Sequence, residues 1–131
     1  MFYSQPAQIT YPMQIDTQQL WLHADTGEFF IGSKPIEGLT PIQRGILTIM
    51  LDRVGVYLTK TDIINAAWPD DIAREGVSDD ALFQQMSSLR KRLRRYNAQP
   101  FIVTWRGIPE GGYRLLRNGR FLTIPSHTQT R

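Results

Sequence analysis

The sequence predicts an α+β domain in which short strands come first, three helices follow and a β-hairpin comes last. Three observations predict this order. Short apolar runs separated by turn residues come before residue 40, apolar residues at helical spacing lie between residues 40 and 97, and two apolar runs enclose a glycine-rich reversal after residue 100. The 131 residues, 41% of them hydrophobic, are enough for one domain with its own core.

The N-terminal part predicts an arm and three strands. Residues 1–12 contain two prolines and are assigned to an extended arm. Strands are expected at residues 13–15, 20–23 and 28–31, and Asp25-Thr26-Gly27 predicts the turn between the last two. The domain itself is expected to span residues 13–124, and residues 125–131 form a polar tail.

Two start signals predict the first two helices. Thr40 is a preferred N-cap and Pro41 suits the first helical position, so a helix is expected over residues 41–52. Its expected buried residues are Ile42, Ile46, Ile49 and Met50, or their neighbours. Thr59-x-x-Asp62 resembles a capping box, and Pro69 stops a second helix expected over residues 60–68. The segment 69–77 is predicted to be a polar loop.

A third helix is predicted from Ser78, a preferred N-cap, to about residue 96. Its apolar residues recur at i, i+4, i+7 and i+11, which defines one buried stripe: Leu82, Met86, Leu89 and Leu93. The opposite side of this helix is polar and carries Gln84, Ser88, Lys91 and Arg95, flanked by Gln85, Ser87 and Arg92.

The C-terminal part predicts a hairpin of residues 101–105 and 112–116. Trp105 and Tyr113 on these strands, like Trp68 at the end of the second helix, are expected to pack rather than to contact a ligand. Asn118-Gly119 is a signal for a type I′ turn, so a further strand is predicted over residues 120–124.

Charge is distributed unevenly along the chain. Residues 1–89 contain five Lys or Arg and eleven Asp or Glu, a balance of −6, whereas residues 90–131 contain ten and one, a balance of +9; together these give the net +3. Part of the cationic run at residues 90–95 is accounted for by the preference of helix C-termini for positive charge. With Arg106, Arg114, Arg117 and Arg120 added, the asymmetry favours a polyanionic partner such as nucleic acid.

Several other kinds of chemistry lack a signature. The chain has no cysteine, its two histidines are far apart, and it contains no phosphate loop, nucleophile elbow or acid–base pair, so neither an enzyme nor a metal or cofactor site is expected. No apolar run approaches the roughly 20 residues of a membrane span, and no segment resembles a signal peptide. A cytoplasmic protein is therefore expected.

The ordered motifs resemble the winged-helix effector domain of OmpR/PhoB-type transcriptional regulators. Leu39-Thr40-Pro41 is similar to the opening of that family's first helix, and Trp68 to the tryptophan that closes its second helix. Leu89-Arg90-Lys91-Arg92-Leu93 resembles Leu-Arg-Lys-Lys-Leu, and Thr104-Trp105-Arg106-Gly107 followed by Gly112-Tyr113-Arg114-Leu115 resembles Thr-Val-Arg-Gly-x-Gly-Tyr-Arg-Leu.

The resemblance implies a winged helix-turn-helix: an N-terminal antiparallel sheet, a three-helix core and a C-terminal hairpin wing. It implies that the third helix enters the major groove of double-stranded DNA and that the wing contacts phosphates and the minor groove. By motif position, Trp68, Arg90, Thr104 and Arg106 inherit contact roles. The expected DNA-binding residues are Gln84, Gln85, Ser88, Arg90, Lys91, Arg95, Thr104 and Arg106. Gln84 and Gln85 suit adenine, Arg106 suits phosphate or a narrow minor groove, and the Thr104 hydroxyl suits phosphate.

Departures from the family pattern leave two functions open. Asp80, Ala81, Phe83, Gln85 and Ser88 stand where members of the family have Arg, Thr, Asp, His and a long basic residue. The chain is thus expected to be either a DNA-binding regulator of modest sequence selectivity or a winged-helix protein-interaction module, with Phe83 and the acidic loop as its working surface. No receiver domain accompanies these residues, so the chain either acts alone or is a module of a longer protein.

The acidic segment 69–77 suggests a second partner. In the family, the connection between the second and third helices can contact RNA polymerase. Here it carries Asp70, Asp71 and Glu75, which are either a solvated surface or a docking site for a basic partner. A second copy of the chain on the same DNA is a further candidate partner.

Overall fold

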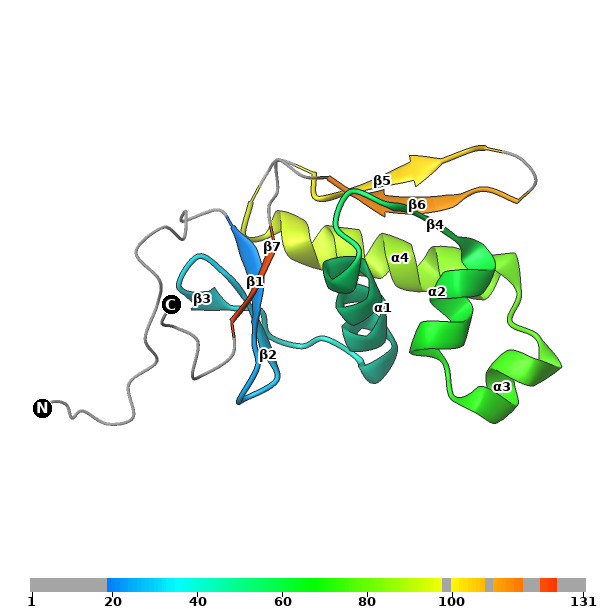
Figure 1. Ribbon diagram of the computed structural model, residues 1–131, viewed down its shortest axis with the longest axis horizontal. Coiled ribbons are helices and arrows are strands. Elements are labelled where there is room, and N and C mark those ends of the chain that lie inside the picture. The colour runs from blue at the N-terminus through cyan, green and yellow to red at the C-terminus, as the bar shows by residue number, and fades with distance from the viewer. Residues whose placement is uncertain (1–18, 98–99, 108–109, 117–120, 125–131) are drawn as a thin grey trace, which may run out of the picture.

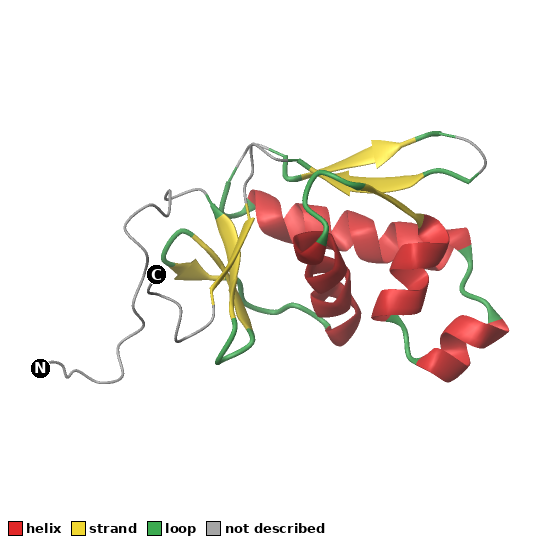
Figure 2. Ribbon diagram, in the orientation of Figure 1, coloured by secondary structure: helices red, strands yellow, loops and turns green. Residues whose placement is uncertain are grey.

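Two β-sheets and a group of helices make up the described part of the chain (Figures 1 and 2). The computed structural model describes residues 19–97, 100–107, 110–116 and 121–124, the last by their backbone. The predicted arm, the strand at residues 13–15, the Asn118-Gly119 turn and the polar tail lie outside these residues. Strands come before the helices and a hairpin after them, as an α+β winged helix requires.

The first sheet has the strand order β3-β2-β1-β7. β1 (Leu20–His23) and β2 (Glu28–Ile31) are antiparallel with Leu20 opposite Ile31, and β3 (Lys34–Pro35) follows β2 in the same manner. Gly27 makes the predicted turn: its φ is 74°, and its N–H donates to the His23 carbonyl at 2.8 Å. The prediction of these two strands and their turn is confirmed.

The last strand, β7 (Phe121–Ile124), belongs to the first sheet and runs parallel to β1 (Figure 1). The strand predicted over residues 120–124 is therefore confirmed. The sequence did not indicate its neighbour, and the structure places β7 in a different sheet from β6, the strand that comes before it in the chain. Leu20 and Trp21 on β1 are completely buried. β7 pairs with the edge of β1 that faces away from β2, so β1 is hydrogen-bonded on both sides.

The first two helices begin at the predicted caps. α1 (Pro41–Asp52) has a capping box in which the Gln43 N–H donates to the Thr40 hydroxyl and the Thr40 N–H to the Gln43 side chain, both at 3.1 Å. α2 (Lys60–Ala67) has the predicted box between Thr59 and Asp62. It ends one residue earlier than expected, since the residue before a proline favours extended backbone and Trp68 adopts it.

The segment predicted as a polar loop contains a helix, α3 (Asp70–Glu75). The prediction of a loop over residues 69–77 is therefore wrong. Asp70 and Asp71 in its first turn and Arg74 in its last both suit the helix dipole, and Gly76 ends it at a φ of 109°. None of its residues is buried, so the apolar periodicity that identifies longer helices is missing.

The third predicted helix is α4 (Asp79–Arg94), capped by the Ser78 hydroxyl, which accepts from the Ala81 N–H at 3.0 Å. The predicted stripe is confirmed: Leu82, Met86, Leu89 and Leu93 are all buried in the core. α1 packs against α4 and α2 and buries Gln43, Ile46, Leu47, Met50 and Leu51. Ile42 and Ile49, expected to be buried, are only partly so.

The second sheet contains β4 (Tyr57–Thr59), β5 (Ile102–Trp105) and β6 (Gly112–Leu115) in the order β4-β6-β5. β5 and β6 form the predicted hairpin, called the wing here (residues 101–116), with Thr104 opposite Tyr113. β4, which the sequence did not predict, pairs with β6 so closely that a Cβ at position 112 would overlap the Leu58 carbonyl. Gly112 thus admits β4 to the sheet.

Candidate nucleic-acid interface

The cationic run at the end of α4 divides into structural and exposed side chains. Arg90 is half-buried, and its Nη2 donates to the Thr104 hydroxyl on β5 at 2.8 Å. Its guanidinium lies 5.3 Å from the centre of the Tyr113 ring, and burial lowers the pKa of Arg90. Arg90 therefore connects α4 to the wing through its contacts with Thr104 and Tyr113.

Arg92 joins α4 to the first sheet in a similar way. Its Nη1 donates to the Glu37 carbonyl at 3.0 Å, and its guanidinium lies so close to Gly38 that a Cβ there would collide with it. The Tyr96 hydroxyl accepts from the Glu37 N–H at 3.2 Å. The segment between the first sheet and α1 is thus held by the C-terminal end of α4.

The remaining cations of α4 are exposed. Lys91, Arg94 and Arg95 are directed to solvent, and within the described part of the chain they make no hydrogen bond or salt bridge. The same holds for Arg106 at the end of β5. Guanidinium and ammonium groups in this state remain available for phosphate.

The first three turns of α4 present a face without cations. Gln84 and Ser88, which were predicted on the outward side of the helix, are exposed, and Gln85, which was predicted on its flank, is partly buried. The Ser88 hydroxyl accepts from the Gln43 amide on α1 at 3.1 Å. Sequence reasoning missed Gln43, although the spacing Thr40-x-x-Gln43 is itself a capping-box signal.

The start of α4 is also tied to α2. The Lys60 ammonium forms a salt bridge with Asp79 at 3.0 Å, and the hydrogen bond that it donates to the Asp79 carboxylate raises the pKa of Lys60. Asp80 is exposed beside this pair. The acidic end of α4 is therefore partly neutralised within the protein.

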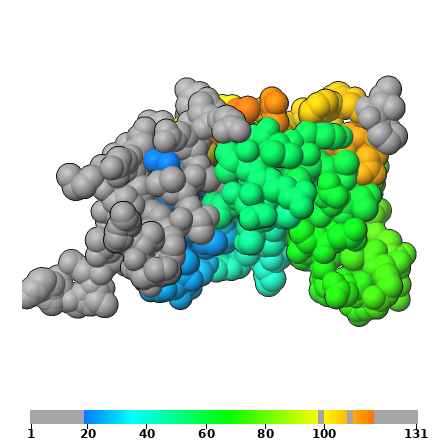
Figure 3. Space-filling model, in the orientation of Figure 1, coloured from blue at the N-terminus to red at the C-terminus, as the bar shows by residue number. Residues whose placement is uncertain are grey.

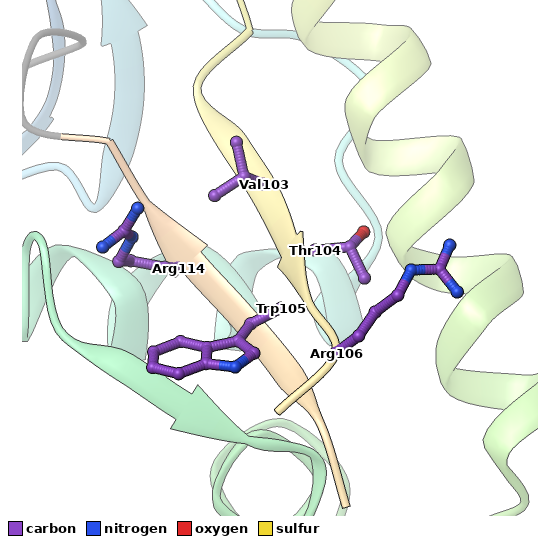
Figure 4. A pocket seen from close by; sticks show the side chains of 5 residues that line it. All are labelled: Val103, Thr104, Trp105, Arg106 and Arg114. Carbon is purple, nitrogen blue, oxygen red and sulfur yellow. The ribbon is translucent and has the colours of Figure 1, made fainter. Parts of the chain in front are cut away.

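The wing carries different side chains on its two faces (Figure 4). Thr104 and Arg106 extend to one side of β5, and Trp105 to the other. These three residues, with Val103 and Arg114, line a hollow of about 360 Å³. Trp105 packs on Tyr57, with ring centres 3.9 Å apart, and lies against Gly107, yet it remains 42% exposed. The expected packing roles of Trp68 and Tyr113 are confirmed, since Tyr113 is buried and Trp68 packs against the core.

The return strand of the wing is anchored to the start of α2. The Glu110 carboxylate accepts from the Thr61 hydroxyl at 3.2 Å and from the Thr61 N–H at 3.4 Å, and the Lys60 N–H donates to the Gly111 carbonyl at 3.3 Å. Sequence reasoning missed Glu110, because its partner lies 49 residues away.

The three acids of the predicted partner site lie together on α3. Asp70, Asp71 and Glu75 are all exposed, and Ile72 beside them is 44% exposed. α3 projects at the edge of the helical group that lies away from the wing (Figures 1 and 3). The acidic surface and the exposed cations are thus on separate parts of the molecule.

Among the residues that the structure describes, no group of three His, Cys, Asp or Glu side chains is arranged to hold a metal ion. No helix among them has the length and apolar content needed to cross a membrane.

The model of one protein family, described as transcriptional regulatory protein, C terminal, matches residues 34–115. The chain belongs to this family. The match includes all four helices and both strands of the wing, so the resemblance in the motifs is confirmed. No match was found among curated protein sequences.

Two solved structures of DNA-binding domains share the fold of this family member. The DNA-binding domain of the response regulator AdeR, in complex with an intercistronic region, is 24% identical with a TM-score of 0.60; the similarity covers 78% of this chain and 97% of that one. The Klebsiella pneumoniae RstA DNA-binding domain, in complex with the RstA box, is 18% identical with a TM-score of 0.52 and covers 70% and 85%. At these identities the likeness establishes the winged-helix fold.

Proposed function

We propose that the chain is the DNA-binding effector domain of a transcriptional regulator. α4 enters the major groove of duplex DNA, and the wing lies along the flanking phosphates and the minor groove. The observation that carries the proposal is a set of exposed cations at the end of α4 and directly after β5 that have no partner among the described residues, namely Lys91, Arg94, Arg95 and Arg106. Membership of the family and the DNA complexes of AdeR and RstA support it.

Individual residues take different parts in this proposal. Gln84, Gln85 and Ser88 face base edges, whereas the four exposed cations, Arg94 included, contact phosphates. Arg90 acts through Thr104, whose hydroxyl it holds toward the DNA side of the wing. Because Gln85 and Ser88 are neutral, we expect sequence discrimination near the low end of the usual range of about 10³ to 10⁷.

A salt titration tests the proposal. Binding of a labelled random-sequence duplex is measured by fluorescence anisotropy between about 50 and 200 mM salt. Each neutralised phosphate contributes roughly −0.9 to the log–log slope, so four contacts give a slope of about −4. Lys91→Ala or Arg106→Ala is expected to reduce the steepness of the slope by about 0.9, the contribution of one phosphate contact. Arg74→Ala, which removes an exposed cation from α3, is the matched control and leaves the slope unchanged. No binding at low salt would refute DNA binding and favour the protein-interaction module.

We further propose that α3 is a docking site for RNA polymerase or another basic partner. The supporting observation is that its three acids and Ile72 are exposed on a helix away from the wing. DNA bound by α4 and the wing therefore leaves α3 accessible. Surface charge of this kind affects mainly the rate of association.

A further inference from the structure

Phe83 is an exposed aromatic residue on the helix that the proposed function places in the major groove. Its side chain is 59% exposed, more than any other large hydrophobic residue in the described part of the chain. It follows the buried Leu82 and lies outside the stripe that faces the core. An aromatic ring in water forgoes the stabilisation of burial, so this ring has apolar surface that a partner in contact with α4 can bury.

The position of Phe83 on α4 groups it with the exposed polar residues. Ser87, one turn later, and Gln84, the next residue, are both exposed. Arg90, a further turn along the same side, reaches the wing through Thr104. Phe83 thus lies on the outward face of α4, on the flank nearer the wing.

The chemistry around Phe83 is neutral and then cationic. Residues 79–89 contain no Lys or Arg, so the side chains that read guanine are missing from the first three turns of α4. The exposed cations begin at Lys91. This arrangement suits a polyanion whose charged backbone contacts the end of α4 while its uncharged groups contact Phe83.

The major groove offers one apolar group, the C5 methyl of thymine, and apolar side chains including Phe contact it. We infer that Phe83 recognises this methyl group in the bound DNA, with Gln84 beside it suited to adenine. This inference rests on the proposed function. Because the first three turns of α4 carry no Lys or Arg to read bases, Phe83 would supply another means of selecting the DNA sequence.

Removing the methyl group from the DNA tests the inference directly. A duplex is first selected from a random pool with the wild-type chain, and each thymine is then replaced by deoxyuridine. At one or more positions the wild type is expected to bind the uracil duplex about fourfold more weakly, the factor for burying one methyl group. Phe83→Ala binds the thymine and uracil duplexes equally, and its thermal melt shows that it folds.

A matched variant and the remaining outcomes complete the test. Ile72→Ala removes an exposed apolar side chain from α3 and keeps the full thymine–uracil difference. If the wild type binds DNA but shows no such difference, the inference fails and the proposed function stands. If Phe83→Ala keeps the difference, the inference also fails and Phe83 is left for a protein partner. A wild type that binds no duplex overturns the proposed function and the inference together.

Discussion

Arg90 and Lys91 are adjacent in sequence but are expected to respond to mutation in opposite ways. Arg90→Ala removes the hydrogen bond to Thr104 and the contact with the Tyr113 ring. A hydrogen bond from a charged group contributes about 1.5 to 3 kcal/mol to stability, and a cation–π contact at an exposed site about 0.5 to 1 kcal/mol.

The low end of this range applies for two reasons. Thr104 is exposed, so its hydroxyl recovers a bond to water, and the buried Nε of Arg90 has no partner among the described residues. We therefore expect Arg90→Ala to lower the free energy of unfolding by about 2 kcal/mol. For a domain of this size, that corresponds to a fall in Tm of about 8 °C.

The assay pairs urea unfolding with DNA binding. Arg90→Ala is expected to lower stability and leave the salt slope of DNA binding unchanged, because the guanidinium is turned to the wing. Lys91→Ala is expected to keep stability within about 0.5 kcal/mol and to reduce the slope by about 0.9. If Arg90→Ala leaves stability intact and lowers the slope as Lys91→Ala does, then Arg90 is a phosphate contact, and its contacts with Thr104 and Tyr113 do not contribute to stability.

Three further predictions concern other parts of the molecule. Arg106→Ala is expected to weaken DNA binding by about 1 kcal/mol or more at low salt with an unchanged melting temperature; an unchanged Kd would exclude Arg106 from the interface. Replacing all three α3 acids, Asp70, Asp71 and Glu75, by Ala should leave DNA affinity equal or slightly higher while transcription from a bound promoter falls; undiminished transcription at equal occupancy would leave α3 a solvated helix. Gly112→Ala should unfold the wing, because its Cβ would meet the Leu58 carbonyl; a variant with native stability, measured by urea unfolding, would show that the backbone of β4 yields.

Local chemistry made most of the fold predictable. Thr40, Thr59 and Ser78 cap their helices as expected, because each hydroxyl bonds to an N–H only three residues away. The stripe from Leu82 to Leu93 is equally local, since helical geometry alone puts those residues on one face. α3 was missed because a short helix that buries nothing leaves no such pattern.

The candidate site was predictable as a region and less so residue by residue. The charge asymmetry and the motifs placed the cations on α4 and the wing, and Lys91, Arg95 and Arg106 are exposed there. The separation of Arg90 and Arg92 from these exposed cations depends on Thr104 and the Glu37 carbonyl, which are 14 and 55 residues away.

The sequence by itself determined where the helices begin, which residues form the core stripe and where positive charge accumulates, because these depend on neighbours within a few residues. Only the tertiary structure decided that β7 joins β1, that Gly112 admits β4 to the second sheet and that two of the arginines on α4 turn inward. Each of these depends on which distant segment supplies a hydrogen-bond partner, and a local pattern carries no information about such partners until the chain is folded.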